Sequence, residues 1–230
     1  MFKLKLPKQE QGFTLIEVLI AILIATIFIT VAMQAVVIAA MFKARAKQFS
    51  EATIWIQQDL ENVRQEAAIV GYTTLSATPT SLNSLSLSST TGFANSNKLQ
   101  IGTATTTFST TISGISGNTI TVDPALASAP PAGTPVSVLT TGSTDTTLCY
   151  ANAQNNGFGN LLSNNLPTLI SSTKTIAGKT YTLSRTATVR DATPYEVLQI
   201  NYTVAEGSNT PIATLNTEVI PNAAFQCPAY

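Results

Sequence analysis

The residue whose type and place point most directly to chemistry is Glu17, because it lies at the start of a long apolar stretch. The 25 residues from Val18 to Phe42 contain no charged side chain. A carboxylate at the edge of such a run is costly in lipid and therefore indicates a functional role. The alternative is that Glu17 only reaches the lipid headgroup layer, and both interpretations stay open at this point.

The composition leaves little for catalysis, cofactor binding or nucleic-acid binding. The 230 residues include no histidine, which excludes Ser-His and Cys-His hydrolysis and any histidine-ligated metal site. The 12 Lys and Arg balance the 12 Asp and Glu, and they form no basic stripe that could neutralise phosphates. Only 10% of the residues are charged, and the mean hydropathy is +0.23. We therefore expect no enzyme, no cofactor and no evident nucleic-acid site.

The acidic residues of the C-terminal part show no metal-ligand pattern. They are Asp123, Asp145, Asp191, Glu196, Glu206 and Glu218. No two of them are separated by only one residue, and none lies in a sequence like an EF-hand loop. We therefore expect no metal site.

A single long helix is predicted to carry Glu17. No Pro or Gly interrupts the chain from Phe13 to Val70, and Gly71 supplies a stop. About 20 apolar residues span a bilayer, so the uncharged first half is long enough to cross a membrane. It is too long for the apolar core of a secretory signal, and no small-residue cleavage site follows it.

Polar and apolar residues divide this helix into two halves. In the first half, Thr26, Thr30 and Gln34 line one face, where they meet a neighbouring helix or, for the threonines, their own backbone. The second half has an apolar stripe made of Phe49, Ala52, Ile56, Leu60, Val63, Ala67 and Val70. Their spacing of three or four residues places them on one face, so this half needs a globular partner.

The N-terminal residues resemble the signal of type IV pilins and pseudopilins. A short basic leader, residues 1–12, ends in Gly12 and is followed by Phe13. Glu17 comes four residues after Phe13, inside the sequence GFTLIEVLIA, and an uncharged apolar helix follows. This order of leader, Gly, Phe, Glu and apolar helix is specific to that family.

The resemblance implies how these residues act. A prepilin peptidase would cut between Gly12 and Phe13 on the cytoplasmic side and would N-methylate Phe13. Glu17 would face the N-terminal ammonium of a neighbouring subunit in a filament. Opposite charges attract strongly at low dielectric, whereas either charge alone is heavily penalised, so this pair would favour the correct register during assembly. The implied partners are the peptidase, other pilin or pseudopilin subunits, the inner membrane and the pilus assembly platform.

The orientation in the membrane also follows from the resemblance, because the flanking charges balance. The basic residues on the two sides of the apolar run are Lys3, Lys5 and Lys8 before it and Lys43, Arg45 and Lys47 after it. Such a balance sets no orientation. The resemblance implies a single pass through the inner membrane with the leader in the cytoplasm and the head outside. The subunit would then enter a cell-surface or periplasmic filament.

The absence of proline from the helix favours one subtype. Many major pilins carry a proline in this helix, whereas here Gln34 lies in that region. We therefore expect a minor pilin of a type IV pilus. The alternatives are a pseudopilin of a type II-like secretion machine and, less favoured, a membrane-anchored surface adhesin that does not polymerise.

The middle of the chain is rich in hydroxyl side chains. From Tyr72 to Leu148, 33 of 77 residues are Ser or Thr. Such a segment could be a disordered or O-glycosylated stalk. The alternation of apolar with polar or small residues at 98–101, 119–122 and 135–139 favours short strands in an irregular sheet instead.

The C-terminal third carries clearer strand patterns, at 181–189, 198–204 and 213–219. Arg185 is the exception, since it falls on the apolar face of the first of these strands. We predict a three-stranded antiparallel meander that covers the apolar stripe of the helix. The fold class is α+β, similar to the pilin lollipop. The chain divides into leader 1–12, helix 13–71 (membrane half about 13–42, amphipathic half 43–71) and head 72–230.

Cys149 and Cys227 both follow the membrane segment, in the part that the resemblance places outside the cytoplasm. An even number of cysteines in an oxidising compartment favours one disulfide. By the chain-entropy model, closing so wide a loop would contribute about 4.5 kcal/mol. The bond would be similar to the C-terminal disulfide loop of pilins, and the alternative is two unpaired buried thiols.

Overall fold

The computed structural model describes residues 14–103, 106–140 and 148–227. The chain divides into two compact units, with the boundary between Gln48 and Phe49. The described part of the first unit is helical from Leu15 onward. The second unit holds the last part of the same helix together with all the strands of the described residues.

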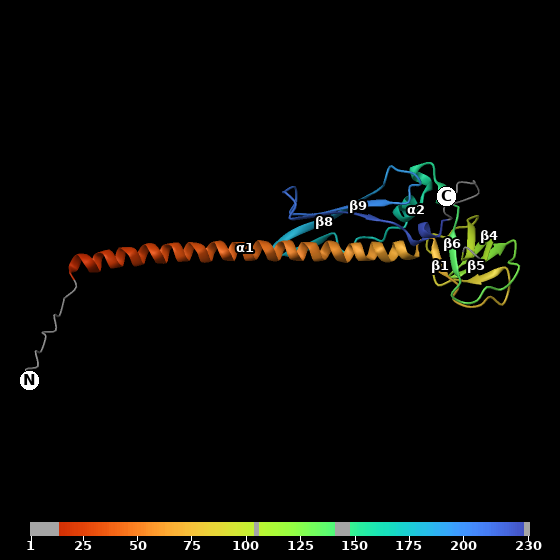
Figure 1. Ribbon diagram of the computed structural model, residues 1–230, viewed down its shortest axis with the longest axis horizontal. Coiled ribbons are helices and arrows are strands. Elements are labelled where there is room, and N and C mark those ends of the chain that lie inside the picture. The colour runs from red at the N-terminus through yellow and green to blue at the C-terminus, as the bar shows by residue number, and fades with distance from the viewer. Residues whose placement is uncertain (1–13, 104–105, 141–147, 228–230) are drawn as a thin grey trace, which may run out of the picture. The chain divides into compact units, whose positions relative to one another are not determined.

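The long helix α1 runs from Leu15 to Ile69 and contains 55 residues (Figure 1). A continuous helix of this length is what the lack of Pro and Gly predicted. It ends where Gly71 adopts a φ of +65°, a left-handed value that glycine reaches without steric cost. The Gly71 N–H then donates to the carbonyl of Thr91 at 2.9 Å instead of to the helix.

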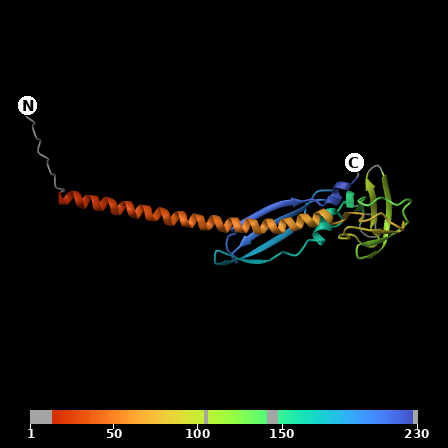
Figure 2. The same cartoon turned by 90° about the horizontal axis from the view of Figure 1, so that it is seen from below.

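A four-stranded antiparallel sheet lies along the second half of α1 (Figure 2). Its order is β10-β9-β8-β7, with β7 at Thr173–Ile176, β8 at Lys179–Val189, β9 at Leu198–Ala205 and β10 at Ala213–Val219. The sequence predicted only three of these strands and missed β7. Strand β7 joins β8 through Ala177 and Gly178, whose φ values of 50° and 80° suit a two-residue hairpin turn. Three of its four residues are exposed, so it lacks an apolar alternation.

The core between α1 and this sheet confirms most of the predicted stripe. The buried apolar residues on this side of the core are Ala52, Trp55, Ile56, Leu60, Val63 and Ala67 on α1 and Val70 directly after it. The sheet contributes Ile176, Tyr181, Leu183, Leu198, Ile200, Tyr202, Val204, Ala213 and Val219. The prediction for Phe49 was wrong, because its side chain is 57% exposed. Burial on α1 begins at Ala52, one turn after Phe49, and Trp55 supplies the large apolar side chain at this end.

A carboxylate lies inside this core. Asp59 is 1% exposed, and its Oδ2 accepts hydrogen bonds from Arg185 Nη1 and from the Tyr202 hydroxyl, both at 2.8 Å. Arg185 Nη2 also donates to the Pro167 carbonyl. Burial, followed by the hydrogen bond to Asp59, raises the pKa of Tyr202, so its hydroxyl keeps its proton and remains a donor. Arg185 thus faces the apolar side of β8 because a buried anion lies opposite it.

The described residues between 72 and 138 form a second, six-stranded antiparallel sheet. The sequence predicted three of its strands, at 98–101, 119–122 and 135–139, and missed the other three. Its order is β1-β6-β3-β4-β5-β2. The strands are β1 (Tyr72–Thr74), β2 (Ser84–Ser86), β3 (Lys98–Thr103), β4 (Thr106–Ser116), β5 (Thr119–Asp123) and β6 (Pro135–Val138). The interpretation as a disordered stalk is therefore wrong for this segment.

The two edge strands of this sheet meet and close it into a barrel. Leu75, directly after β1, pairs antiparallel with Leu87, directly after β2. The N–H of Ser76 donates to the Ser86 carbonyl, and the N–H of Ser88 donates to the Thr74 carbonyl, each at 2.9 Å. These pairings complete the ring of strands in the described part of the barrel, so β1 and β2 are not free edge strands. Apolar side chains such as Leu85, Leu99, Ile101, Ile120, Val136 and Val138 fill its interior.

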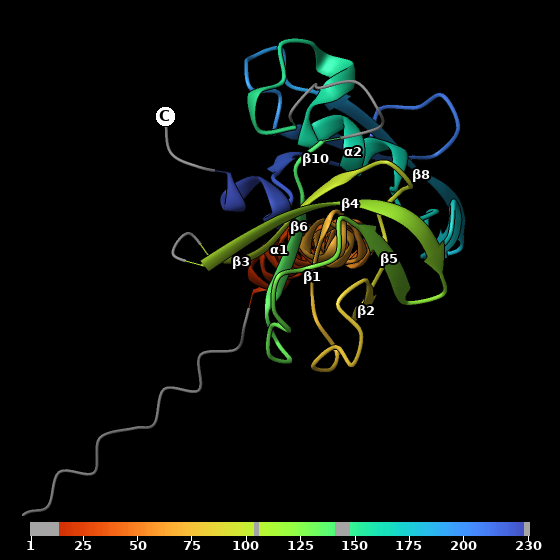
Figure 3. The same ribbon diagram turned by 90° about the vertical axis from the view of Figure 1, so that its right-hand side faces the viewer.

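The barrel is held against the C-terminal end of α1 (Figure 3). The N–H of Val138 in β6 donates to the Gly71 carbonyl at 2.9 Å. Gly92 approaches so closely that a Cβ there would lie 2.7 Å from the Gly71 nitrogen and 2.8 Å from a Val70 methyl. Glycine at position 92 therefore lets the barrel close over the end of the helix.

A disulfide joins the segment that follows the barrel in the chain to the C-terminal segment. Cys149 lies in η1 (Leu148–Tyr150), which follows the barrel, and it is bonded to Cys227 across a Cα separation of 5.4 Å. Cys227 directly follows η3 (Asn222–Gln226). The connection from η1 to β7 contains η2 (Gln154–Asn156) and α2 (Phe158–Asn164). The bond that the cysteine count favoured is therefore present, and it ties the two ends of the sheet-containing segment together.

Replacing Asp59 by Asn should destabilise the head, because it leaves the Arg185 guanidinium buried without its counter-charge. Breaking one partner of a buried ion pair costs about 3–5 kcal/mol, which lowers the melting temperature of a head of this size by about 10 °C. Thermal unfolding of the detergent-solubilised chain, followed by near-ultraviolet circular dichroism, measures the shift.

Asp191→Asn is the matched control, since Asp191 lies exposed in the loop after β8. The double variant Asp59→Leu with Arg185→Met should lose less stability than the two single changes added together. Equal melting temperatures for Asp59→Asn and Asp191→Asn would contradict the assignment of an energetic role to the buried pair.

Candidate functional site

The start of α1 is the first described part of the predicted assembly site. Gly12 and Phe13, where cleavage and methylation were predicted, lie outside the described residues. The Thr14 carbonyl accepts the first helical hydrogen bonds, from the N–H of Glu17 at 3.0 Å and of Val18 at 3.3 Å. Glu17 therefore lies in the first turn of α1, where a carboxylate is favoured by the positive end of the helix dipole.

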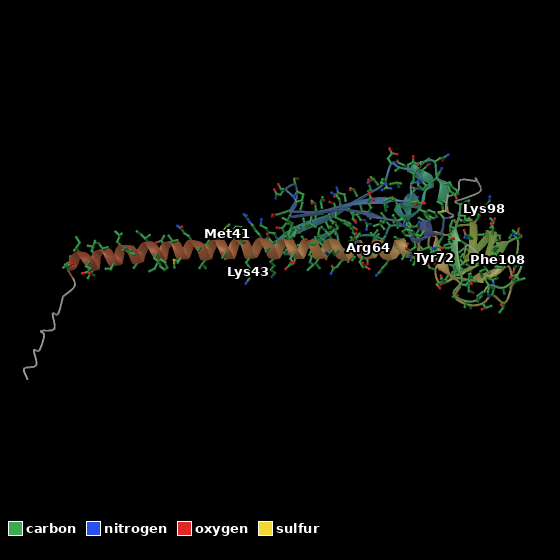
Figure 4. The ribbon with its side chains drawn as sticks, viewed as in Figure 1. Met41, Lys43, Arg64, Tyr72, Lys98 and Phe108 are labelled. Carbon is green, nitrogen blue, oxygen red and sulfur yellow. A yellow bond between two sulfur atoms is a disulfide. The ribbon has the colours of Figure 1, made fainter. Side chains whose placement is uncertain are left out.

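The helix surface that follows Glu17 is apolar and uncovered within its own unit (Figure 4). Every described residue from 14 to 47 is exposed, including large side chains such as Ile24 at 61% and Phe28 at 73%. An 18-residue window of α1 reaches a mean hydropathy of 2.8, and α1 is the one helix of the described residues that is long and apolar enough to cross a membrane. Exposing so much apolar surface to water is energetically unfavourable, so this half of α1 needs lipid or other helices around it.

The two threonines of the polar stripe are satisfied by the helix itself. The Thr26 hydroxyl donates to the Leu23 carbonyl at 2.8 Å, and the Thr30 hydroxyl donates to the Thr26 carbonyl at 2.7 Å. Of the two interpretations of the stripe, these bonds support the one in which threonine meets its own backbone. The threonines therefore give no separate indication of a neighbouring helix, whereas these bonds do not involve Gln34, the third residue of the stripe.

The charge-free segment ends at Phe42, and Lys43 is the first charged residue after it (Figure 4). From Val18 to Lys43 the helix rises about 38 Å at 1.5 Å per residue, against a bilayer core of about 30 Å. The segment is thus long enough to cross the core with some tilt. With Glu17 at its start, it can act as a membrane anchor whose one carboxylate attracts a cation.

A metal ion would need a set of ligand side chains that lie close together. Within the described residues, no group of three or more Asp, Glu, Cys or His side chains lies close enough to hold a metal ion. The cysteines are joined to each other in the head, in the second unit of the chain. The expected lack of a metal site stays a prediction.

The functional residues that the sequence analysis missed are those of the buried pair in the head. Asp59 was not singled out, and Arg185 was noted only as an exception in a strand pattern. Two signals in the sequence could have connected them. Asp59 lies three residues after Ile56 and so shares the buried helix face, and Arg185 falls on the apolar face of its strand. Two opposite charges on faces that pack together predict a buried ion pair.

Comparison with known protein families matches the N-terminal segment. Residues 7–33 match the family described as the prokaryotic N-terminal methylation motif. The matched segment contains Gly12, Phe13 and Glu17 and the first half of the apolar run. We found no similar curated protein and no similar solved structure. The chain therefore carries the signature of type IV pilins and pseudopilins, and the motif with its apolar helix indicates membrane anchoring.

Replacing Gly12 by Trp should leave the leader attached, because a bulky side chain beside the scissile bond would hinder the peptidase. In cells that contain a prepilin peptidase, intact-mass analysis should then show a chain that still includes residues 1–12. Gln11→Ala is the control in the same leader and should give the processed chain. A Gly12→Trp product that begins at residue 13 would show that the cleavage site lies elsewhere.

Proposed function

We propose that the chain is a minor pilin, a structural subunit that is processed by prepilin peptidase and assembles into a type IV pilus. The proposal rests on the methylation motif, whose glutamate lies in the first turn of a helix with exposed apolar side chains. Cleavage between Gly12 and Phe13 would place the new ammonium, N-methylated, four residues before Glu17. This helix, rather than any catalytic group, would do the work of the protein.

The assembly step follows from the cost of a lone charge in an apolar bundle. The Glu17 carboxylate would pair with the Phe13 ammonium of a neighbouring subunit, and each charge would offset the desolvation of the other. A subunit in the wrong register would leave both charges unpaired in a low-dielectric environment. The pair would thus select the correct axial position while the apolar side chains supply most of the contact area.

The architecture of the head favours the proposal of a minor pilin over that of a major pilin. Its barrel has an apolar core that is separate from the core between α1 and the four-stranded sheet. The barrel is therefore not needed to cover α1 and is free to give the filament a particular surface. A major subunit is further disfavoured by the lack of proline in α1.

The proposed location follows the same steps. The subunit would be stored in the inner membrane, with the leader in the cytoplasm and the head outside, and the assembly platform would then move it into the filament. A pseudopilin of a type II-like secretion machine is the second candidate, because it would carry the same motif and helix. We also propose that the head is not an enzyme.

Mass spectrometry of filaments sheared from the source cells, with the membrane fraction alongside, tests this function. The minor-pilin proposal expects a peptide that begins at N-methylated Phe13 and is a scarce component of the filaments. Processed chain found only in membranes would favour a pseudopilin. Leader still attached in cells with an active peptidase would favour the anchored adhesin that does not polymerise.

Replacing Glu17 by Gln should leave the chain in the membrane but impair its incorporation into filaments. The change removes the charge and keeps the shape of the side chain, so the apolar contacts are preserved while the ion pair is lost. We expect the amount recovered from sheared filaments to drop at least about tenfold. A tenfold change in an equilibrium constant corresponds to about 1.4 kcal/mol, and the attraction between two opposite charges at low dielectric is larger than that.

Thr26→Val is the matched control in the same helix, because the Thr26 hydroxyl bonds only to its own backbone in the described structure. It should be incorporated as well as the unmodified chain. Normal incorporation of Glu17→Gln would refute the role assigned to the carboxylate. Equal losses for the two variants would show that the helix is sensitive to any change and not to this charge.

A further inference from the structure

The face of the four-stranded sheet that points away from α1 is hollowed by a groove across three strands. Its volume is about 450 Å³, and the lining side chains include Thr186 and Thr188 of β8, Gln199 and Asn201 of β9, and Asn216 and Glu218 of β10. All six are exposed. At about 4.8 Å between strands, the groove spans about 10 Å, which is more than one sugar ring in length.

Among the residues that line the groove, Glu218 is the charged one, and the others are Thr, Asn, Gln and Ile side chains. Glu218 accepts a hydrogen bond from Gln199 Nε2 at 3.1 Å, and its other oxygen lies 3.4 Å from Arg190 Nη1. The carboxylate thus has one neutral and one cationic neighbour, both at the exposed surface. A phosphate-bearing ligand would find no Lys or Arg among the residues that line this groove.

The centre of the groove offers side-chain amides that are ready to bind. Within the described residues, the side chains of Asn201 and Asn216 make no hydrogen bond, and they lie opposite each other in the β9–β10 register. Each amide presents one acceptor and two donor hydrogens in a plane. Two neighbouring hydroxyls of a sugar can donate to and accept from such a plane at the same time.

We propose that this groove binds a neutral saccharide chain. The planar side chains of Asn201, Asn216 and Glu218 would bind pairs of ring hydroxyls, and the threonines of β8 would add single hydrogen bonds. No aromatic side chain lines the groove, so affinity would rest on hydrogen bonds of modest net strength. A single head would therefore bind weakly, and many heads or many sugar units would be needed for firm attachment.

The test is binding of the full chain to an immobilised panel of neutral oligosaccharides of glucose, galactose, mannose and N-acetylglucosamine. Sialylated and sulfated oligosaccharides are printed beside them. The chain is kept in lauryldimethylamine oxide, because a detergent with a sugar headgroup would compete. We expect retention on at least one neutral oligosaccharide and not on the charged ones alone.

The double variant Asn201→Ala with Asn216→Ala should lose at least about tenfold of that binding, since several hydrogen bonds disappear. Thr214→Ala is the matched control, because Thr214 is exposed on the same face of β10 but does not line the groove. It should bind like the unmodified chain. Equal near-ultraviolet circular dichroism of all three proteins shows that the sheet is intact.

Three outcomes would overturn the proposal. The first is no retention on any neutral oligosaccharide. The second is unchanged retention of the double variant. The third is a groove occupied by a second copy of the chain, seen as self-association in solution that the double variant abolishes.

Discussion

The head depends on the contact between the second half of α1 and the four-stranded sheet. Each partner buries apolar surface of the other, because the stripe of the helix packs on the inner face of the sheet. Asp59 makes this contact specific. Its bonds to Arg185 and Tyr202 exist in one register only, since a shift of the helix by one turn would move the carboxylate about 5.4 Å from both donors. The apolar side chains give the contact its strength, and the buried pair fixes where the helix sits.

The barrel is attached to this framework rather than built into it. Its six strands close on themselves around a separate apolar core, and they meet the end of α1 through backbone bonds at Gly71. The Cys149–Cys227 disulfide adds a covalent tie between the segment that leaves the barrel and the segment that follows β10. In the described part of the barrel strands, Lys98 and Asp123 are the charged residues. The polar character of these strands thus comes mainly from Ser and Thr rather than from charge.

The sequence predicted the elements that depend on local patterns and missed those that depend on distant contacts. The length of α1 follows from the absence of Pro and Gly, and strands β8, β9 and β10 follow from their alternation. Phe49 fits the helical spacing, but its exposure depends on where the sheet ends, which spacing alone does not contain. The closure of the barrel depends on the pairing of Leu75 with Leu87 outside the named strands. The role of Asp59 depends on a partner 126 residues away in the chain.

The two carboxylates of α1 that lie in apolar surroundings pose the same physical problem. Asp59 is buried by the head and finds its cation, Arg185, within the same chain. Glu17 lies in the first turn of the bare half of α1, where the described residues offer it no cation. A charge left unpaired in an apolar environment is heavily penalised, so Glu17 needs its counter-charge from outside the folded chain once the helix enters lipid or a bundle. In the proposed filament, the first pair would hold one subunit together and the second would join it to the next.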